Sequence, residues 1–218
     1  MNNECDIFAI TETHLNKSIS NNELNINGFN LERKDRTGPG RRKGGVSIYV
    51  NSKINYKLRT DKILEESLLI EITFPNIAPF LFGVAYRPRS ATASFTEKIL
   101  NTLEEITNEG KEFIFCGDMN IDLNILRSTK RDSVTKYEKA KVNSSLEDMN
   151  NLGLKQIIKE PTRIAPDRTI PGSGVLLKGR KSTLDHIYTN KPQNISYSSV
   201  PKISASDHFP VCAVKITS

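Results

Sequence analysis

The sequence contains few cysteines and no long hydrophobic run. Its three cysteines, Cys5, Cys116 and Cys212, are an odd number, lie far apart and include no Cys-x-x-Cys pair. This pattern argues against a secreted disulfide framework and against a zinc site, so we expect reduced cysteines in the core of an intracellular protein. No apolar run approaches the roughly 20 residues that span a membrane. The N-terminus does not resemble a signal peptide either, so we expect no membrane partner.

The chain also lacks an internal repeat, a low-complexity tract and a convincing linker. Its 218 residues exceed the commonest domain size. Layered α/β structures of this length nevertheless often form one unit, in which about 70% of the surface of the unfolded chain can be buried. We therefore expect residues 1–218 to form a single domain.

The net charge of +6 comes from 31 basic and 25 acidic residues and is unevenly distributed. The basic residues gather in two clusters, which are Arg33 to Lys43 (with Arg36, Arg41 and Arg42) and Lys178 to Lys181 (with Arg180). Such runs usually lie in solvated loops, but they also form contacts with polyanions. The charge pattern alone leaves both interpretations open.

The most informative stretch runs from Phe113 to Leu123. A short apolar run, 113–116, ends at Gly117 and is followed by Asp118, one spacer and Asn120. A short apolar run bounded by glycine predicts a strand that is buried on both faces. Side chains two positions apart in an extended chain share a face, so Asp118 and Asn120 would point the same way. The alternative is a capped turn, because Gly, Asp and Asn are ordinary turn residues.

The remaining predicted elements form an α/β pattern. Alternation predicts strands over 44–50, 68–74 and 80–86, which we interpret as an antiparallel meander, while 15–43 reads as a loop with at most a short element near 24–29. Capping patterns at Ser94 and Ser144 predict helices that end at Gly110 and Gly153. Residues 161–179 are rich in proline and glycine and read as a long loop. Further strands are expected over 183–188, 195–200 and 211–216.

Polar residues follow or interrupt several of these strands. Each has an ordinary alternative as a turn cap, a core aromatic, an exposed strand residue or a loop histidine. The residues concerned are Glu12, Tyr86, Arg87, Asp118, Asn120, Asp185, Asp207 and His208.

Taken together, these motifs resemble the endonuclease/exonuclease/phosphatase superfamily. They are Thr-Glu-Thr at 11–13, Ala-Tyr-Arg-Pro at 85–88, Gly-Asp-Met-Asn at 117–120, Leu-Asp-His-Ile at 184–187 and Ser-Asp-His-Phe-Pro-Val at 206–211. Within the superfamily, the chain is most similar to the apurinic-type endonuclease domain of LINE-type retrotransposons, in which Tyr-Arg-Pro and Pro-Thr-Arg, here 161–163, are frequent. The resemblance implies a four-layered α/β sandwich, with two mostly antiparallel sheets face to face and helices outside.

The resemblance also implies a role for each polar residue in cutting a phosphodiester. Such a cut needs a metal to neutralise the phosphoryl group, a base for the attacking water, and donors for the phosphate oxygens. Glu12 would hold Mg²⁺ or Mn²⁺ with Asp207 nearby, since hard carboxylate oxygens suit these ions. Asp118 would orient or deprotonate the water and Asn120 would fix a phosphate oxygen. His208, oriented by Asp185, and Tyr86 would donate to the phosphate.

The basic residues would then bind DNA through its backbone, without reading its sequence. The residues expected to do so are Arg87, Arg41, Arg42, Lys43 and Lys181.

One departure from the superfamily pattern concerns the N-terminus. Its members begin with a strand and a helix before Thr-Glu-Thr, and that strand carries an Asn that joins the metal site. Met1 stands only a few residues before Ile7, so we expect this unit of roughly 30 residues to be absent. Asn2 and Asn3 are in the wrong place to substitute for it. Nothing that resembles a reverse transcriptase follows Val214.

The expected function is metal-dependent nicking of DNA, as in a retrotransposon endonuclease domain, with the protein in the nucleus. We expect no small-molecule cofactor and no obligate protein partner. Two alternatives stay open. The chain could be an inactive nucleic-acid-binding remnant, which the missing unit favours, or a phosphatase or phosphodiesterase acting on a small or lipid phosphoester. The basic clusters favour DNA.

Overall fold

The computed structural model describes residues 5–36, 44–62, 64–127, 133–169, 173, 176–177, 179–203 and 206–216. Its elements, in chain order, are β1 (Ile7–Thr11), β2 (Phe29–Lys34), β3 (Val46–Asn51), β4 (Asn55–Leu58), β5 (Ser67–Phe74), β6 (Ile77–Ala85), α1 (Ala93–Thr107), β7 (Glu112–Asp118), η1 (Leu123–Arg127), α2 (Ser133–Asn151), β8 (Lys155–Gln156), β9 (Arg163–Ile164), β10 (Arg168–Thr169), β11 (Leu176–Leu177), β12 (Lys181–Ser182), β13 (Asp185–Thr189), η2 (Pro192–Asn194), β14 (Ile195–Ser199) and β15 (Cys212–Lys215).

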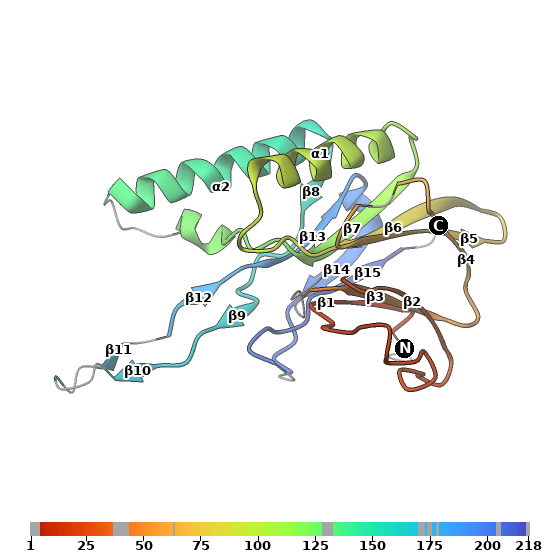
Figure 1. Cartoon of the computed structure of the whole chain (residues 1–218). Helices are drawn as coiled ribbons and strands as arrows, with labels where there is room; N and C mark the ends of the chain where they lie inside the picture. The colour runs from red at the N-terminus through yellow and green to blue at the C-terminus, as the bar shows by residue number, and fades with distance from the viewer. Residues whose placement is uncertain are drawn as a thin grey trace.

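These strands form two layers that face each other. The larger layer is a six-stranded sheet in the order β4-β5-β6-β7-β13-β8, in which β6 and β7 pair in parallel and the other neighbours are antiparallel. The opposite layer contains the antiparallel sheet β1-β3-β2 and the antiparallel pair β14-β15. Figure 1 shows the two layers, with both α-helices above the six-stranded sheet. The predicted α/β sandwich of two mostly antiparallel sheets is therefore confirmed.

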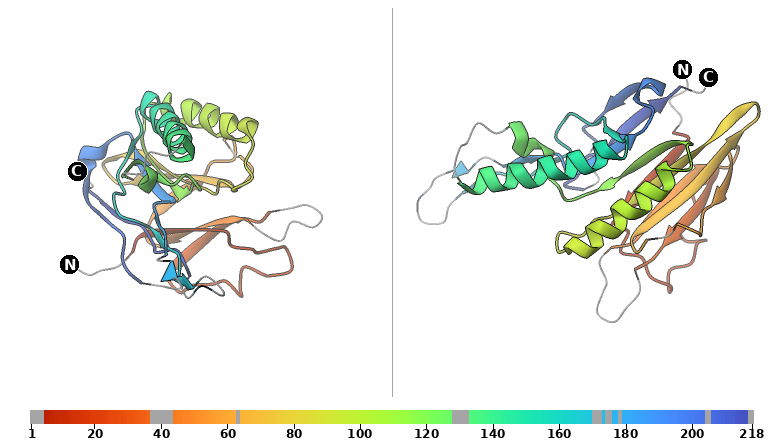
Figure 2. Two further views of the ribbon diagram at one scale, coloured as in Figure 1. Left: turned by 90° about the vertical axis from the view of Figure 1, so that its left-hand side faces the viewer. Right: turned by 90° about the horizontal axis from the view of Figure 1, so that it is seen from above.

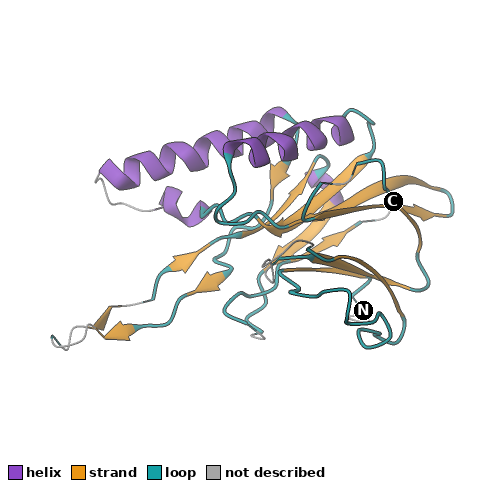
Figure 3. Cartoon of the chain, viewed as in Figure 1, coloured by secondary structure: helices purple, strands orange, loops and turns teal. Residues whose placement is uncertain are grey.

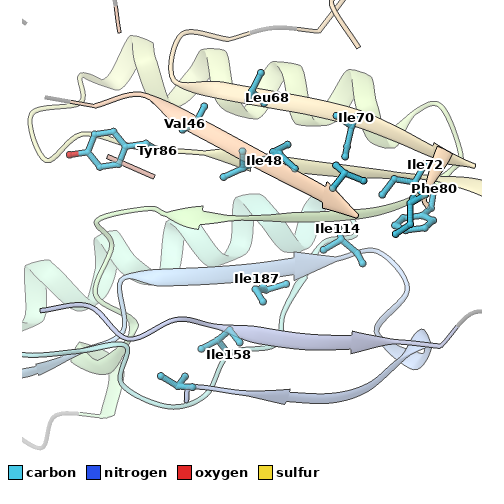
Figure 4. Packing of buried hydrophobic residues seen from close by; sticks show 14 residues of the cluster. Val46, Ile48, Leu68, Ile70, Ile72, Phe80, Tyr86, Ile114, Ile158 and Ile187 are labelled. Atoms are coloured by element: carbon cyan, nitrogen blue, oxygen red, sulfur yellow. The ribbon is translucent and has the colours of Figure 1, made fainter. Parts of the chain in front are cut away.

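The two layers meet in a core of alternating strand residues. Leu68, Ile70 and Ile72 of β5 point into it, as the alternation predicted. Val46 and Ile48 of β3 come from the opposite layer and are fully buried. Figure 4 shows these side chains between the strands. Apolar burial of this kind is the main stabilising term of the sandwich.

A second core lies between the six-stranded sheet and the helices. Phe113 and Phe115 of β7 face this core, where Leu103 of α1 and Met149 of α2 pack, while Ile114 faces the core between the sheets. Strand β7 is thus buried on both faces, as predicted. Within the described residues both α-helices cover this same sheet, as Figures 2 and 3 show from other directions and by element type.

Both helices begin earlier than predicted. The N-cap of α1 is Thr92, whose side chain accepts a hydrogen bond from the Phe95 N–H. Helix α2 begins at Ser133, eleven residues before the predicted capping residue Ser144. Ser144 and Ser145 instead lie in the middle of this helix. The Ser145 hydroxyl is satisfied there because it donates to the Lys141 carbonyl one turn back.

Two strand predictions need correction. The meander of the large sheet is β4-β5-β6, and β3 belongs to the other layer. Strand β2 occupies part of the segment that was expected to be a loop. Its apolar residues Phe29 and Leu31 alternate along the strand, which pairs with β3. Phe29 makes an edge-to-face contact with Phe8 of β1, at 5.3 Å between ring centroids.

The predicted loop over 161–179 is in part a two-stranded arm. Strands β9 and β12 form an antiparallel ladder at its base, and β10 and β11 form another farther out. In Figure 1 the arm projects from the left of the molecule, well away from the sheets. The base of the arm carries Arg163, Arg180 and Lys181.

The cysteine prediction holds for one residue of three. Cys116 packs against the core between the sheets, and burial raises the pKa of its thiol to about 12. Cys5 and Cys212 are exposed, so their placement in the core was wrong. Cys5 precedes the edge strand β1, and Cys212 lies on the outward side of β15. None of the helices in the described segments is long and apolar enough to cross a membrane.

Gly117 permits the close approach of β7 to β6, and its replacement tests this. Its φ is +142°, and an added Cβ would lie 1.9 Å from the Ala85 carbonyl oxygen. We expect Gly117→Ala to lower the free energy of unfolding by at least about 2 kcal/mol in urea titrations, because the backbone must move. Gly110→Ala is the control, since its φ is also positive but nothing lies within 4 Å. Equal losses for the two variants would contradict this account.

Candidate active site

The candidate site begins where β7 and β13 lie side by side. In their antiparallel register, Asp118 is directly opposite Asp185. Side chains in this relation point to the same face of the sheet, with Cβ atoms about 5 Å apart. Two residues that are 67 positions apart in the sequence thus place their carboxyl groups together.

Asp118 is the more buried of the two acids, with 5% of its surface exposed. Burial and, next in size, the negative charge of Asp185 raise the pKa of Asp118 to about 6. A hydrogen bond from the Asn120 backbone opposes this shift. Asp118 is therefore mostly ionised at pH 7, with a pKa suited to accepting a proton at neutral pH.

Asn120 orients Asp118 through a strained backbone. Its φ is +48°, which is uncommon outside glycine. In this conformation its backbone N–H donates to Asp118 Oδ1 at 2.9 Å, and its side-chain amide donates to Asp118 Oδ2 at 3.2 Å and to the Arg87 carbonyl at 2.9 Å. Its Oδ1 accepts from Arg89 Nε at 3.1 Å. Asp118 and Asn120 thus act as one hydrogen-bonded unit.

His208 contacts the second acid, Asp185, from the turn before β15. Its Nδ1 lies 2.9 Å from Asp185 Oδ2. This hydrogen bond is the main reason that the pKa of His208 is raised above its usual value, although burial opposes the shift. The structure therefore brings His208 and Asp185 together, and Nε2 remains as the imidazole's second donor when the ring is protonated.

Thr162 holds the turn that carries His208 against β13. The Thr162 hydroxyl accepts from the backbone N–H groups of Leu184 and Asp185, and its carbonyl accepts from the Phe209 N–H at 2.7 Å. Arg163 forms an isolated antiparallel bridge with His208. The base of the arm is thus part of the framework of the site.

Glu12 and Tyr86 form a pair beside the two aspartates. The Tyr86 hydroxyl donates to Glu12 Oε1. Burial and this hydrogen bond raise the pKa of Tyr86, and the Glu12 charge also acts on Asp118. Glu12 has a φ of +52°, and the residues after it pair with Gly44 and Gly45 through backbone hydrogen bonds. The strained acid thus lies at the end of β1, next to the buried tyrosine.

A cation could be held at this place. Within the described part of the chain, the ligand atoms of Asp118, Asp185 and His208 lie within 4.8 Å of one another. Two carboxylates that repel each other in a half-buried setting fit a divalent cation, and hard oxygen donors favour Mg²⁺ or Mn²⁺. Glu12 and Asp207, the predicted metal ligands, are not members of this group.

Asp207 is instead paired with Arg163. Both Nε and a terminal nitrogen of Arg163 lie 2.7 Å from Asp207 Oδ2. This hydrogen bond lowers the pKa of Asp207. Asp207 is therefore held by Arg163, and its predicted metal role stays a prediction.

The predicted DNA-binding residues are spread over different settings. Arg87 is 8% exposed, and its guanidinium lies near the Thr96 hydroxyl and the Met119 carbonyl, so it offers little surface to a polyanion. Burial lowers the pKa of Arg87. Lys181 lies exposed on β12 at the base of the arm. Arg41, Arg42 and Lys43 lie outside the described residues.

His186 is a buried residue of the site region that we did not single out from the sequence. Its Nε2 lies 3.0 Å from the Ile121 carbonyl and 3.2 Å from the Thr183 carbonyl, and its Nδ1 lies 3.1 Å from the Tyr188 hydroxyl. Burial lowers the pKa of His186 to about 4, so the imidazole is neutral at pH 7. It ties the segment after Asn120 to β13. Its position next to Asp185 in the sequence could have indicated that His186 lies near the site, but nothing in the sequence indicated that it is buried.

Asp118 should cost the protein stability when it is ionised. Its pKa in the folded state, about 6, lies above its ordinary value of 3.8, so the folded state binds the proton more tightly. Stability from this group is present at low pH and lost as pH rises through 6. We expect Asp118→Asn to raise the free energy of unfolding at pH 8 by about 2 kcal/mol, measured in urea with EDTA. The difference should shrink toward pH 4, and a variant less stable than wild type at pH 8 would contradict this.

Asp185 should control the protonation of His208. We expect Asp185→Asn to lower the pKa of His208, measured by NMR of its ring protons, because the main hydrogen bond to the imidazolium loses its charge. Asp207→Asn is the control, since the Asp207 charge makes the smallest contribution named for that shift. A larger decrease in Asp207→Asn than in Asp185→Asn would refute the assignment.

Comparisons with known proteins identify a family and a shared fold. A family model described as the endonuclease/exonuclease/phosphatase family matches residues 2–208. A search of curated protein sequences finds no match. The solved structures that resemble the chain have low sequence identity to it, so they show a shared fold.

Three of these structures illustrate the shared fold. The endonuclease domain of TRAS1, a telomere-specific non-LTR retrotransposon, matches with a TM-score of 0.65 and 15% identity, over 94% of this chain and 84% of that one. The AP endonuclease LMAP from Leishmania major matches with a TM-score of 0.74 and 14% identity, over 94% of this chain and 77% of that one. The Xenopus laevis APE2 catalytic domain matches with a TM-score of 0.63 and 14% identity, over 99% of this chain and 86% of that one. The family match confirms the resemblance to the endonuclease/exonuclease/phosphatase superfamily that the motifs indicated.

Proposed function

The chain belongs to the endonuclease/exonuclease/phosphatase family, and on this premise we propose that it hydrolyses phosphodiesters with a divalent metal ion and nicks DNA. The observation that carries the proposal is the cluster of Asp118, Asn120, Asp185 and His208. It combines an ionised base, an amide that orients it and a histidine whose pKa is raised by a carboxylate. Attack of water on a phosphodiester requires these groups within a few ångströms of one another.

Asp118 is the proposed acceptor for the proton of the attacking water. Its raised pKa makes it a stronger base than an ordinary aspartate while it is still ionised at pH 7. The two hydrogen bonds from Asn120 fix the direction of its oxygens. His208, with Nδ1 bound to Asp185, would donate from Nε2 to a phosphate oxygen on which negative charge develops.

A metal ion would supply charge neutralisation on the phosphoryl group. In this chain Asp118 and Asp185 would hold it, with Glu12 adjacent. Tyr86, bonded to Glu12, limits the directions that this carboxylate can take. The fit of the donor set to Mg²⁺ or Mn²⁺ supports the proposed cofactor.

DNA is the proposed substrate because basic residues surround the acidic centre. Arg89, Arg163 and Arg180 line a cavity together with Asn120, and Lys181 is exposed next to Arg180 at the base of the arm. Cations around an acidic centre attract the nucleic-acid backbone irrespective of its sequence. Similar folds include the endonuclease domain of a retrotransposon, which makes nicking of DNA the first activity to test.

The test is incubation of purified protein with supercoiled plasmid in Mg²⁺, Mn²⁺ or EDTA. We expect nicking with either metal, none in EDTA, and losses of about 10²-fold or more in Asp118→Ala, Glu12→Ala and His208→Ala, because they remove the proposed base, a carboxylate adjacent to the proposed cation and the proposed phosphate donor, respectively. Lys191→Gln is the matched control, since Lys191 is exposed beyond the far end of β13. Full nicking in EDTA, or wild-type nicking by His208→Ala, would refute the proposal.

The same preparation separates the two alternatives. Binding of DNA that depends on salt but is never followed by cleavage would identify an inactive nucleic-acid-binding protein. Hydrolysis of inositol phosphates or sphingomyelin without nicking would identify a phosphatase or phosphodiesterase of small or lipid esters.

A further inference from the structure

A cavity of about 460 Å³ lies next to the candidate active site. Its lining includes Asn120, Asp122 and Leu184, together with Arg89, Arg163 and Arg180. We call this cavity the arginine pocket. Neither Asp118 nor His208 lines it, so it is separate from the groups of the proposed reaction, but Asn120 belongs to both.

Each arginine of the pocket is held on one side by an acceptor of the protein. Arg89 Nε donates to Asn120 Oδ1 at 3.1 Å. Arg163 donates from Nε and a terminal nitrogen to Asp207 Oδ2, and Arg180 donates from one terminal nitrogen to Asp122 Oδ2 at 2.9 Å. A guanidinium has five N–H donors, so every one of the three retains donors beyond these contacts.

Asp122 is a fixed support and not a competing ligand. Its Oδ1 accepts from the backbone N–H groups of Thr183 at 2.9 Å and Asn124 at 3.0 Å, and its Oδ2 accepts from Arg180. The side chain of Asp122 is 10% exposed. The three arginines of the pocket therefore meet two carboxylates, Asp122 and the Asp207 partner of Arg163, which leaves a positive excess at the pocket.

We propose that the arginine pocket binds a phosphate of the nucleic-acid strand that flanks the bond being cut. The inference rests on the proposed function, because it assigns the pocket to the same substrate. Guanidinium groups bind phosphate oxygens through paired charge-assisted hydrogen bonds, and planar arginines held in place lose little entropy when they do so. Leu184 offers an apolar contact for the attached sugar.

The link through Asn120 indicates how the pocket would assist the reaction. One end of this amide donates to Asp118 and the other accepts from Arg89. A phosphate seated on Arg89 would therefore position the strand relative to Asp118 through a single side chain. The ligand chemistry, a phosphate on a nucleic-acid strand, is shared by internal phosphodiesters and terminal phosphates, and we assign the pocket to the internal one.

The test measures binding without cleavage. A duplex of about 16 base pairs that lacks terminal phosphates is titrated in EDTA over a range of salt concentrations, with wild type, Arg89→Gln and Arg180→Gln. We expect each variant to bind about 10-fold more weakly and to reduce the salt slope of the binding constant by about 1, because one phosphate contact is lost. Lys191→Gln, which removes an exposed charge at the other end of β13, should change neither value.

Arg180→Lys keeps the variants interpretable. It retains the charge, so the salt slope should stay at the wild-type value, while affinity falls because the planar fork is lost. Circular dichroism checks that each variant is folded. If Arg180→Lys and Arg180→Gln show the same reduced slope, the loss comes from a structural change and the pocket assignment is wrong.

A second arm repeats the titration with a duplex that carries 5′-phosphates. If the variants weaken binding only of the phosphorylated duplex, the pocket takes a terminal phosphate and the assignment to an internal one is overturned. Unchanged slopes in Arg89→Gln and Arg180→Gln on both duplexes would overturn the pocket altogether. Because these readouts need no cleavage, a failure of nicking with reduced slopes would reject the nuclease proposal alone.

Discussion

The antiparallel pairing of β7 with β13 is the constraint on which the candidate active site depends. It places Asp118 opposite Asp185, and through Asp185 it determines where His208 must lie to form its hydrogen bond. A slip of one residue would turn Asp118 to the other face of the sheet. The apolar residues of β7 prevent this, because Phe113 and Phe115 are buried under the helices while Ile114 is buried between the sheets. The core thus specifies the register that assembles the site.

This arrangement is unfavourable for the folded chain in several ways. Asp118 is buried beside a second carboxylate, and both Glu12 and Asn120 have positive φ. Strain of this kind costs of order 1–3 kcal/mol for each residue and persists when the surrounding structure determines the conformation. Here the surroundings are two buried cores and the backbone hydrogen bonds of residues 13–14 with Gly44 and Gly45. The chemistry of the site is therefore supported by packing elsewhere.

The base of the arm connects the acidic centre with the basic residues. Thr162 bonds both to β13 and to the turn of His208, while its neighbour Arg163 bonds to Asp207. Asn120 similarly joins Asp118 to Arg89. Acid and base residues of the site are thus fixed relative to one another by shared partners. For a reaction on a polyanion, this combines a place for a cation with neighbouring places for phosphate.

The sequence by itself predicted strand β7 and the identity of the polar residues, since apolar period and order of motifs are local properties of the chain. The sandwich was implied by the resemblance of those motifs to a known superfamily. The sequence also indicated the pair Asp185 and His208. It did not reveal β2, because this strand contains several polar residues and forms by pairing with β3. It also did not reveal the early start of α2. It placed Arg87 at the surface, whereas packing buries it, and it missed Arg89 and Arg163 as neighbours of Asn120 and Asp207. Partners such as Arg163 and Asp207 are 44 residues apart, and only the tertiary structure decides which distant charges meet, because side-chain pairing across the fold leaves no periodic signal in the chain.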